Sequence, residues 1–113
     1  MTTNELMKKS KVMCQEYGLN IIHECMYNDG TMYSFSAYAD DKTEHAADDR
    51  YLSFSVVYRH NGTQENVSIC IEYMTHISAT ISRATYRIKY NINSSDRVIF
   101  NRISKAVDWL TAI

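Results

Sequence analysis

Two stretches of alternating apolar and polar residues constrain this chain more than any other feature. Apolar side chains occupy every second position of residues 51–59 and 66–74, namely Leu52, Phe54, Val56, Tyr58, Val67, Ile69, Ile71 and Tyr73. A period of two is that of a β-strand with one buried face. The intervening His60-Asn61-Gly62-Thr63 turns the chain. We therefore predict an antiparallel hairpin whose apolar face needs a second layer to cover it.

Three further strands are expected around this hairpin. Residues 19–27 and 31–39 are strand-like and flank Asn28-Asp29-Gly30, which is a strong hairpin signal. A fifth strand, about 80–92, alternates between Ala84, Tyr86, Ile88 and Tyr90 on one face and Arg83, Thr85, Arg87 and Lys89 on the other. Successive hairpins give an antiparallel sheet. Regular alternation in the 19–27 strand would place His23 and Cys25 on the same face.

One helix is predicted at each end of the chain. The first begins with the capping-box pattern Thr2-Thr3-Asn4-Glu5 and stops at Gly18. Its apolar stripe is Leu6, Met7, Ser10, Met13, Cys14 and Tyr17. The second spans about 96–111 after Asn93-Ser94-Ser95, with the stripe Ile99, Phe100, Ile103, Ala106, Val107 and Leu110. Since each helix has one apolar stripe, both should cover the same sheet face. The prediction is an α+β two-layer sandwich of order α-β-β-β-β-β-α.

This sandwich accounts for residues 1–113 as a single domain. Apolar residues make up 45% and charged residues 22%, which is ordinary for a globular protein. No apolar run reaches the roughly 18 residues of a membrane helix, and the first residues lack a secretory signal core. Cys14, Cys25 and Cys70 are an odd set without close pairs, so we expect reduced thiols and a cytoplasmic location.

The sequence lacks the usual motifs of catalytic, metal-binding and phosphate-binding sites. The four histidines lack the short spacings of a zinc site, and residues 40–49 lack the glycine of an EF-hand loop. His76-Ile77-Ser78 matches half of the motif that two-histidine phosphoesterases use twice. The three glycines are explained by turns, which leaves no phosphate-binding loop. We therefore predict no catalytic residues, no metal and no cofactor.

Charge is divided unevenly along the chain. Residues 1–56 carry net charge −4, and residues 57–113 carry +3. The acids concentrate in residues 40–49 as Asp40, Asp41, Glu44, Asp48 and Asp49. Such a patch steers a partner of opposite charge. Our hypothesis is a mobile acidic patch that meets a basic protein, including one that normally holds nucleic acid.

The last helix has a second stripe, formed by Val98, Arg102, Lys105 and Trp109. Trp and Arg are typical anchors of protein interfaces, so this stripe is a candidate partner-binding surface. The alternative is that Trp109 folds over the edge of the sheet as peripheral core.

The bases of the fifth strand favour nucleic-acid binding as the alternative function. Arg83, Arg87 and Lys89 form a basic stripe on the fifth strand, beside Tyr86 and Tyr90. Alternation puts the tyrosines and the bases on opposite faces, and cross-strand pairing with Glu72 is the structural alternative.

The order of the expected helices and strands also favours nucleic-acid binding. The first helix, the hairpin around Gly30 with Tyr33 and Phe35, and the last helix resemble the outline of double-stranded RNA-binding domains. That family has three strands and a lysine cluster at the start of its last helix. Here five strands are expected, and Ser95-Asp96-Arg97 stands in place of the lysines.

The sequence as a whole favours a small non-catalytic binding protein, an inhibitor, adaptor or regulator, and resembles small phage or mobile-element regulators in composition. We expect a single core containing Leu6, Met13, Tyr17, Phe54, Val56, Ile69, Ile71, Ile88, Ile103 and Leu110. A chain without proline can prevent unwanted pairing at an open sheet edge only with charged side chains. A twofold homodimer is therefore expected, either through the weakly charged 19–27 edge or through a hydroxyl-rich sheet face.

Overall fold

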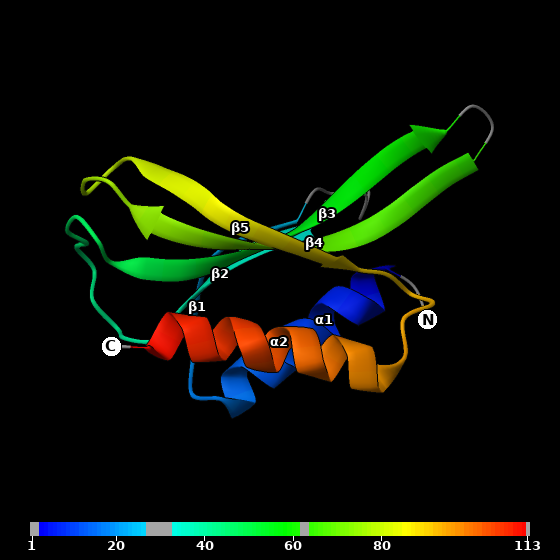
Figure 1. Ribbon diagram of the computed structural model, residues 1–113, viewed down its shortest axis with the longest axis horizontal. Helices are drawn as coiled ribbons and strands as arrows, with labels where there is room; N and C mark the ends of the chain where they lie inside the picture. Colours follow the sequence, from blue (N-terminus) through cyan, green and yellow to red (C-terminus); the bar gives the residue numbers. More distant parts are fainter. Residues whose placement is uncertain (1–2, 27–32, 62–63, 113) are drawn as a thin grey trace.

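Five antiparallel strands form one sheet in the computed structural model, which describes residues 3–26, 33–61 and 64–112. The strands lie in sequence order, so every connection within the sheet joins neighbours. The elements are α1 (Thr3–Glu16), β1 (Asn20–Met26), β2 (Tyr33–Tyr38), β3 (Arg50–Asn61), β4 (Gln64–His76), β5 (Ser82–Tyr90) and α2 (Asp96–Thr111). Both helices lie on the same side of the sheet (Figure 1). The predicted α+β sandwich is confirmed, and α2 has the predicted bounds.

The ends of the helices follow local chemistry. Ser95 caps α2, because its hydroxyl accepts a hydrogen bond from the Val98 amide at 3.2 Å. Gly18 has φ 79 just after α1, the left-handed conformation that glycine adopts without strain. The predicted cap at Thr2 and the predicted turn at Asn28-Asp29-Gly30 lie outside the described residues.

The core lies between the sheet and the two helices. Phe35 and Phe54 stack there with ring centroids 4.6 Å apart. The core cluster includes seven residues of the predicted set, with two more packed against it: Leu6, Phe54, Val56, Ile69, Ile71, Ile103 and Leu110, then Met13 and Ile88.

Two residues that the helical stripes predicted to be buried are exposed. Tyr17 is 40% exposed because α1 ends at Glu16, and Tyr17 belongs to the turn that follows. Phe100 is 50% exposed because it lies on the flank of the α2 stripe, whose centre runs through Ile99, Ile103 and Leu110. Apolar residues on the flank of a helical stripe share its periodicity even where the neighbouring layer does not reach them.

The sheet face opposite the helices is rich in hydroxyl groups. Ser34 pairs with Ser55, and Ser36 pairs with Ser53 across β2 and β3. Ser53 also lies opposite Glu72, which in turn lies opposite Arg87. One end of this face is covered by the chain itself, since His45 of the β2–β3 loop stacks on the buried Tyr38 at 4.3 Å.

The edge strand β1 is irregular. Its pairing with β2 shifts between Ile22 and Cys25, and His23 within this bulge has φ 53. A bulge interrupts alternation, so the shared face expected for His23 and Cys25 does not follow from their spacing. The bulge also makes β1 a poor template for pairing with another strand.

Candidate binding groove between β5 and α2

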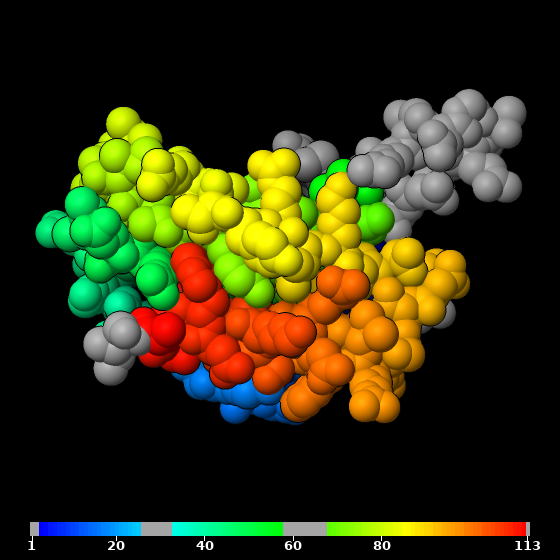
Figure 2. Space-filling view, viewed as in Figure 1, coloured from blue at the N-terminus to red at the C-terminus, as the bar shows by residue number. Residues whose placement is uncertain are grey.

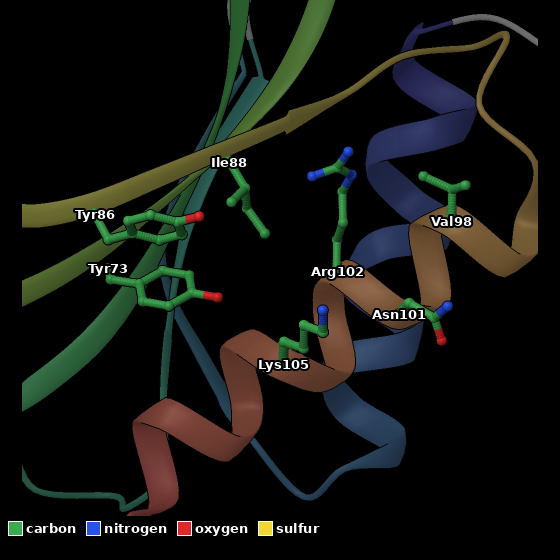
Figure 3. Close-up of a pocket in the computed structure, with 7 residues that line it drawn as sticks. All are labelled: Tyr73, Tyr86, Ile88, Val98, Asn101, Arg102 and Lys105. Atoms are coloured by element: carbon green, nitrogen blue, oxygen red, sulfur yellow. The ribbon is translucent and has the colours of Figure 1, made fainter.

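A pocket of about 300 Å³ lies between the edge strand β5 and the outward side of α2. Figure 3 shows the side chains around it, from the sheet on one side and from α2 on the other. They are Tyr73, Tyr86, Ile88, Val98, Asn101, Arg102 and Lys105. Three of the four residues of the predicted helix stripe therefore line one groove, together with aromatic and apolar side chains of the sheet.

Strand register supplies the sheet side of the groove. Tyr73 of β4 lies opposite Tyr86 of β5, and their rings are 5.1 Å apart in an edge-on arrangement. The register shifts after this pair, and Thr85 in the shift donates a hydrogen bond to the Tyr73 carbonyl at 3.1 Å. The alternation of β5 predicts Tyr86 and Ile88 on one face, but nothing in the sequence indicates that α2 lies beside them.

The groove is cationic. Arg102 and Lys105 both line it, and no carboxylate is among its lining residues. The Nε atom of Arg102 is buried and has no hydrogen-bond partner in the described part of the chain. A buried unpaired donor costs free energy. Burial, with Tyr86 as a second cause, raises the pKa of Tyr73, so its phenol stays a hydrogen-bond donor at neutral pH.

Trp109 belongs to the fold rather than to the free surface of this stripe. Its ring packs on Tyr73 at 4.9 Å, and the Arg50 guanidinium lies 4.8 Å from the ring centre. Arg50 also donates a hydrogen bond to the Trp109 carbonyl at 2.8 Å. This packing favours the structural alternative, in which Trp109 folds over the edge of the sheet, and its partner-binding role stays a prediction.

The bases of β5 lie on both of its faces, so the predicted single stripe is wrong. The register shift at Thr85 puts Arg83 opposite Thr75, on the face that carries Tyr73, whereas Arg87 lies opposite Glu72 on the other face with Lys89. Arg83, Arg87 and Lys89 are exposed, and Arg87 forms the predicted cross-strand pair with Glu72 at 3.3 Å. In the space-filling view, β5 in yellow lies directly above α2 in orange and red (Figure 2). The bases of β5 and the bases of α2, which are separate in the sequence, thus lie beside the same edge of the sheet.

The acidic segment is a loop anchored to the end of β4. The Asp48 amide donates to the His76 carbonyl, and the His76 amide donates to the Asp49 carbonyl, each at 2.8 Å. The Asp49 carboxylate accepts the Ala46 amide at 3.0 Å, which lowers the pKa of Asp49. Asp40 accepts the Lys42 amide. Asp40, Asp41, Glu44 and Asp48 are exposed and Asp49 is half-buried, so the loop carries the predicted acids on its surface. Its partner-binding role stays a prediction.

A histidine–tyrosine cluster went undetected in the sequence because its members are far apart in the chain. The rings of His45 and His76 stack at 4.9 Å, and Tyr38 and Tyr51 pack beside them. His76 Nε2 lies 2.9 Å from the Tyr38 hydroxyl, and its Nδ1 lies 3.2 Å from the Ser78 carbonyl. Both ring nitrogens of His76 therefore lie within hydrogen-bond distance of other groups of the fold.

The histidines of this cluster share a pocket with a third histidine. His23 joins His45 and His76 around a second pocket, which Cys25 does not line. Across residues 3–26, 33–61 and 64–112, no three histidine, cysteine or acidic side chains are grouped closely enough to hold a metal ion.

Comparisons with models of protein families, with curated proteins and with solved structures found no significant match. The outline shared with double-stranded RNA-binding domains therefore rests only on the order of the elements, and the sheet has five strands instead of three. None of the helices in the described ranges has the length and apolar character needed to cross a membrane.

Proposed function

We propose that this chain is a small non-catalytic binding protein, an inhibitor, adaptor or regulator, that holds an acidic protein partner in the groove between β5 and α2. The observation that supports the proposal most directly is the presence of Arg102 and Lys105 in one groove that no carboxylate lines. Charged hydrogen bonds from arginine to carboxylate are among the strongest that proteins form. A carboxylate of the partner would bind in the groove beside the Arg102 guanidinium and the Lys105 ammonium.

The apolar walls of the groove supply the rest of the affinity. Tyr86 is 57% exposed and Val98 is 39% exposed, so both lose contact with water when a partner covers them. Aromatic residues beside arginine are typical of interface centres. The partner segment should therefore combine acidic and apolar side chains.

The second candidate is a single-stranded nucleic acid held by the same bases. Arg87 and Lys89 on one face of β5, with Arg83 exposed on the other, favour it, because phosphates are also anionic. Stacking of bases requires free aromatic faces. Tyr73 is packed between Tyr86 and Trp109, so its ring is already in use. This arrangement favours the acidic protein segment.

A retention experiment tests the proposal. The full chain is immobilised and exposed to host lysate, with and without nuclease treatment. The expected result is a protein that survives nuclease, is lost with Lys105→Glu, and is retained by the matched variant Lys8→Glu on the exposed side of α1. A partner that disappears with nuclease favours the nucleic-acid alternative. A partner retained equally by both variants binds elsewhere, and the proposed groove is then wrong.

We further propose a cytoplasmic location and a twofold homodimer. All three cysteines are free, with Cys14 and Cys70 buried, as a reducing compartment permits. The bulge at His23 disfavours pairing through β1, so the dimer would form through the serine-rich face of the sheet.

A further inference from the structure

The outer edge of β5 is an open strand edge beside the cationic groove. β5 ends the strand order of the sheet, so among the described residues only β4 pairs with it. From Tyr86 to Tyr90 the pairing with β4 is regular, which keeps this half of the strand extended. An extended edge presents a row of backbone donors and acceptors to any strand placed beside it.

Charge on this edge selects the kind of strand that can pair there. Arg87 and Lys89 are exposed on one face of β5, and Arg102 and Lys105 stand by the other face. Only Arg87 is paired with a carboxylate in the described part of the chain, at 3.3 Å from Glu72. A second copy of β5 would bring like charges together, whereas an acidic strand would meet bases on both of its faces.

We propose that the acidic partner segment binds as a sixth strand along the Tyr86–Tyr90 edge of β5. This inference rests on the proposed function and specifies how the groove is occupied. Alternate side chains of the added strand enter the groove beside Tyr86, Ile88 and Arg102, and the others lie along Arg87 and Lys89. Main-chain hydrogen bonds then provide affinity, and the two basic rows provide specificity.

The geometry of the groove fits an extended occupant. Side chains of β5 alternate between the groove and the opposite face, with Tyr86 and Ile88 on one side and Arg87 and Lys89 on the other. An added strand alternates in the same way, because successive side chains point to opposite faces. Figure 3 shows Arg102 extending from α2 toward β5, where groove-facing side chains of an added strand would pass.

Backbone methylation of a test peptide separates strand addition from simple charge attraction. The probe is a dye-labelled peptide of alternating valine and glutamate, about as long as β5, and binding to the full chain is followed by fluorescence anisotropy. In an extended strand, consecutive residues direct their N–H groups to opposite edges. Methylating the valine nitrogens therefore blocks one edge, and methylating the glutamate nitrogens blocks the other, while the charges stay the same.

We expect one methylated isomer to bind at least about tenfold more weakly than the other, because only one peptide edge faces β5. Arg87→Gln together with Lys89→Gln should also weaken the unmethylated peptide, whereas Lys8→Gln should not. Equal binding of the two isomers overturns strand addition, and so does absence of binding by the unmethylated peptide. A single-stranded oligonucleotide that displaces the peptide and binds more tightly overturns the choice of a peptide.

The same experiment separates this inference from the proposed function. If the isomers bind equally but Lys105→Glu abolishes binding, the groove is the site and strand addition is wrong. If Lys105→Glu binds the unmethylated peptide as tightly as the native chain does, the proposed groove itself fails.

Discussion

The hydroxyl of Ser10 on α1 lies 2.6 Å from the phenol oxygen of Tyr90 on β5, and both groups are buried. Ser10 uses its own proton to bond the Leu6 carbonyl at 2.8 Å, so the Tyr90 hydroxyl is the donor in this pair. The contact joins the first helix to the last strand, 80 residues away in sequence. This hydrogen bond fixes the last residue of β5, the strand along whose edge the partner segment is proposed to bind.

This pair should show an asymmetric response to mutation. Tyr90→Phe leaves Ser10 bonded to Leu6, so we expect a loss of about 1 kcal/mol in the free energy of unfolding. Ser10→Ala leaves the buried Tyr90 hydroxyl without a partner, and we expect about 1–3 kcal/mol. Urea unfolding measures both, and the double variant should lose less than the sum. Equal costs that add fully would contradict the assigned donor and acceptor.

The centre of the core should be sensitive to loss of volume at Phe54. Its side chain is 0% exposed and stacks on Phe35. Phe54→Ala should therefore lower the free energy of unfolding by about 3–5 kcal/mol, which threatens folding of a domain this size. Phe100→Ala is the matched control, and because Phe100 is half exposed we expect a cost of about 0.5 kcal/mol or less. Chemical denaturation that found similar costs for the two variants would refute the assignment of the core.

Stability should fall in alkaline solution. Burial raises the pKa of Cys14 from 9.0 to about 12, and burial followed by contact with Glu24 raises that of Tyr33 from 10.0 to about 12. The folded state binds these protons more tightly than the unfolded state does. Their contribution is therefore complete below about pH 9 and is lost as the pH rises toward about 12.

Unfolding free energies measured from about pH 8 to about pH 11 should show this decline. Cys14→Ala should reduce its earliest part, because a thiol has a lower ordinary pKa than a phenol. The remainder of this part belongs to Cys70, whose pKa is also raised by burial. For each variant, the unfolding free energy at high pH is compared with that of the same variant at low pH. The cost of the mutation itself therefore cancels. An unchanged decline near pH 9 in Cys14→Ala would assign the effect to other groups.

The proposed dimer predicts a mass of about twice 13.1 kDa by light scattering at tens of micromolar. Ser53 and Ser55 lie at the centre of the hydroxyl-rich face, in β3 between β2 and β4. Ser53→Lys with Ser55→Lys should yield a monomer, because like charges would meet across a twofold axis. Lys8→Glu serves as the surface control. If light scattering shows that the native chain is a monomer, the proposed dimer is wrong.

The acidic loop predicts a charge-dependent association rate. Asp41, Glu44 and Asp48 are exposed, and neutralising them as Asn, Gln and Asn leaves the Asp49–Ala46 contact intact. Binding of a lysine-rich test peptide, followed by stopped flow, should slow and lose salt dependence. Asp108→Asn on α2 is the matched control. If the triple variant matches the native rate at every salt concentration, the loop does not steer partners.

Local patterns predicted most of the fold and part of the site. Leu52, Phe54, Ile69 and Ile71 could be assigned to the buried face because alternation reflects the geometry of a single strand. Arg102 and Lys105 could be singled out because their spacing places them on one side of a helix. Nothing local indicated that Tyr86 would face them, since that depends on strand register and on where α2 crosses the sheet.

The sequence by itself determined the two helices, the five strands and the faces they bury, because backbone geometry and burial of apolar side chains set these periodicities within one element. Tertiary structure alone decided the bulge at His23, the stacking of His45 on His76 and the burial of the Arg102 Nε. Each of these joins or bends segments that lie far apart in the chain or in different layers. Their geometry is settled by packing of the whole sandwich, which no short stretch of sequence encodes.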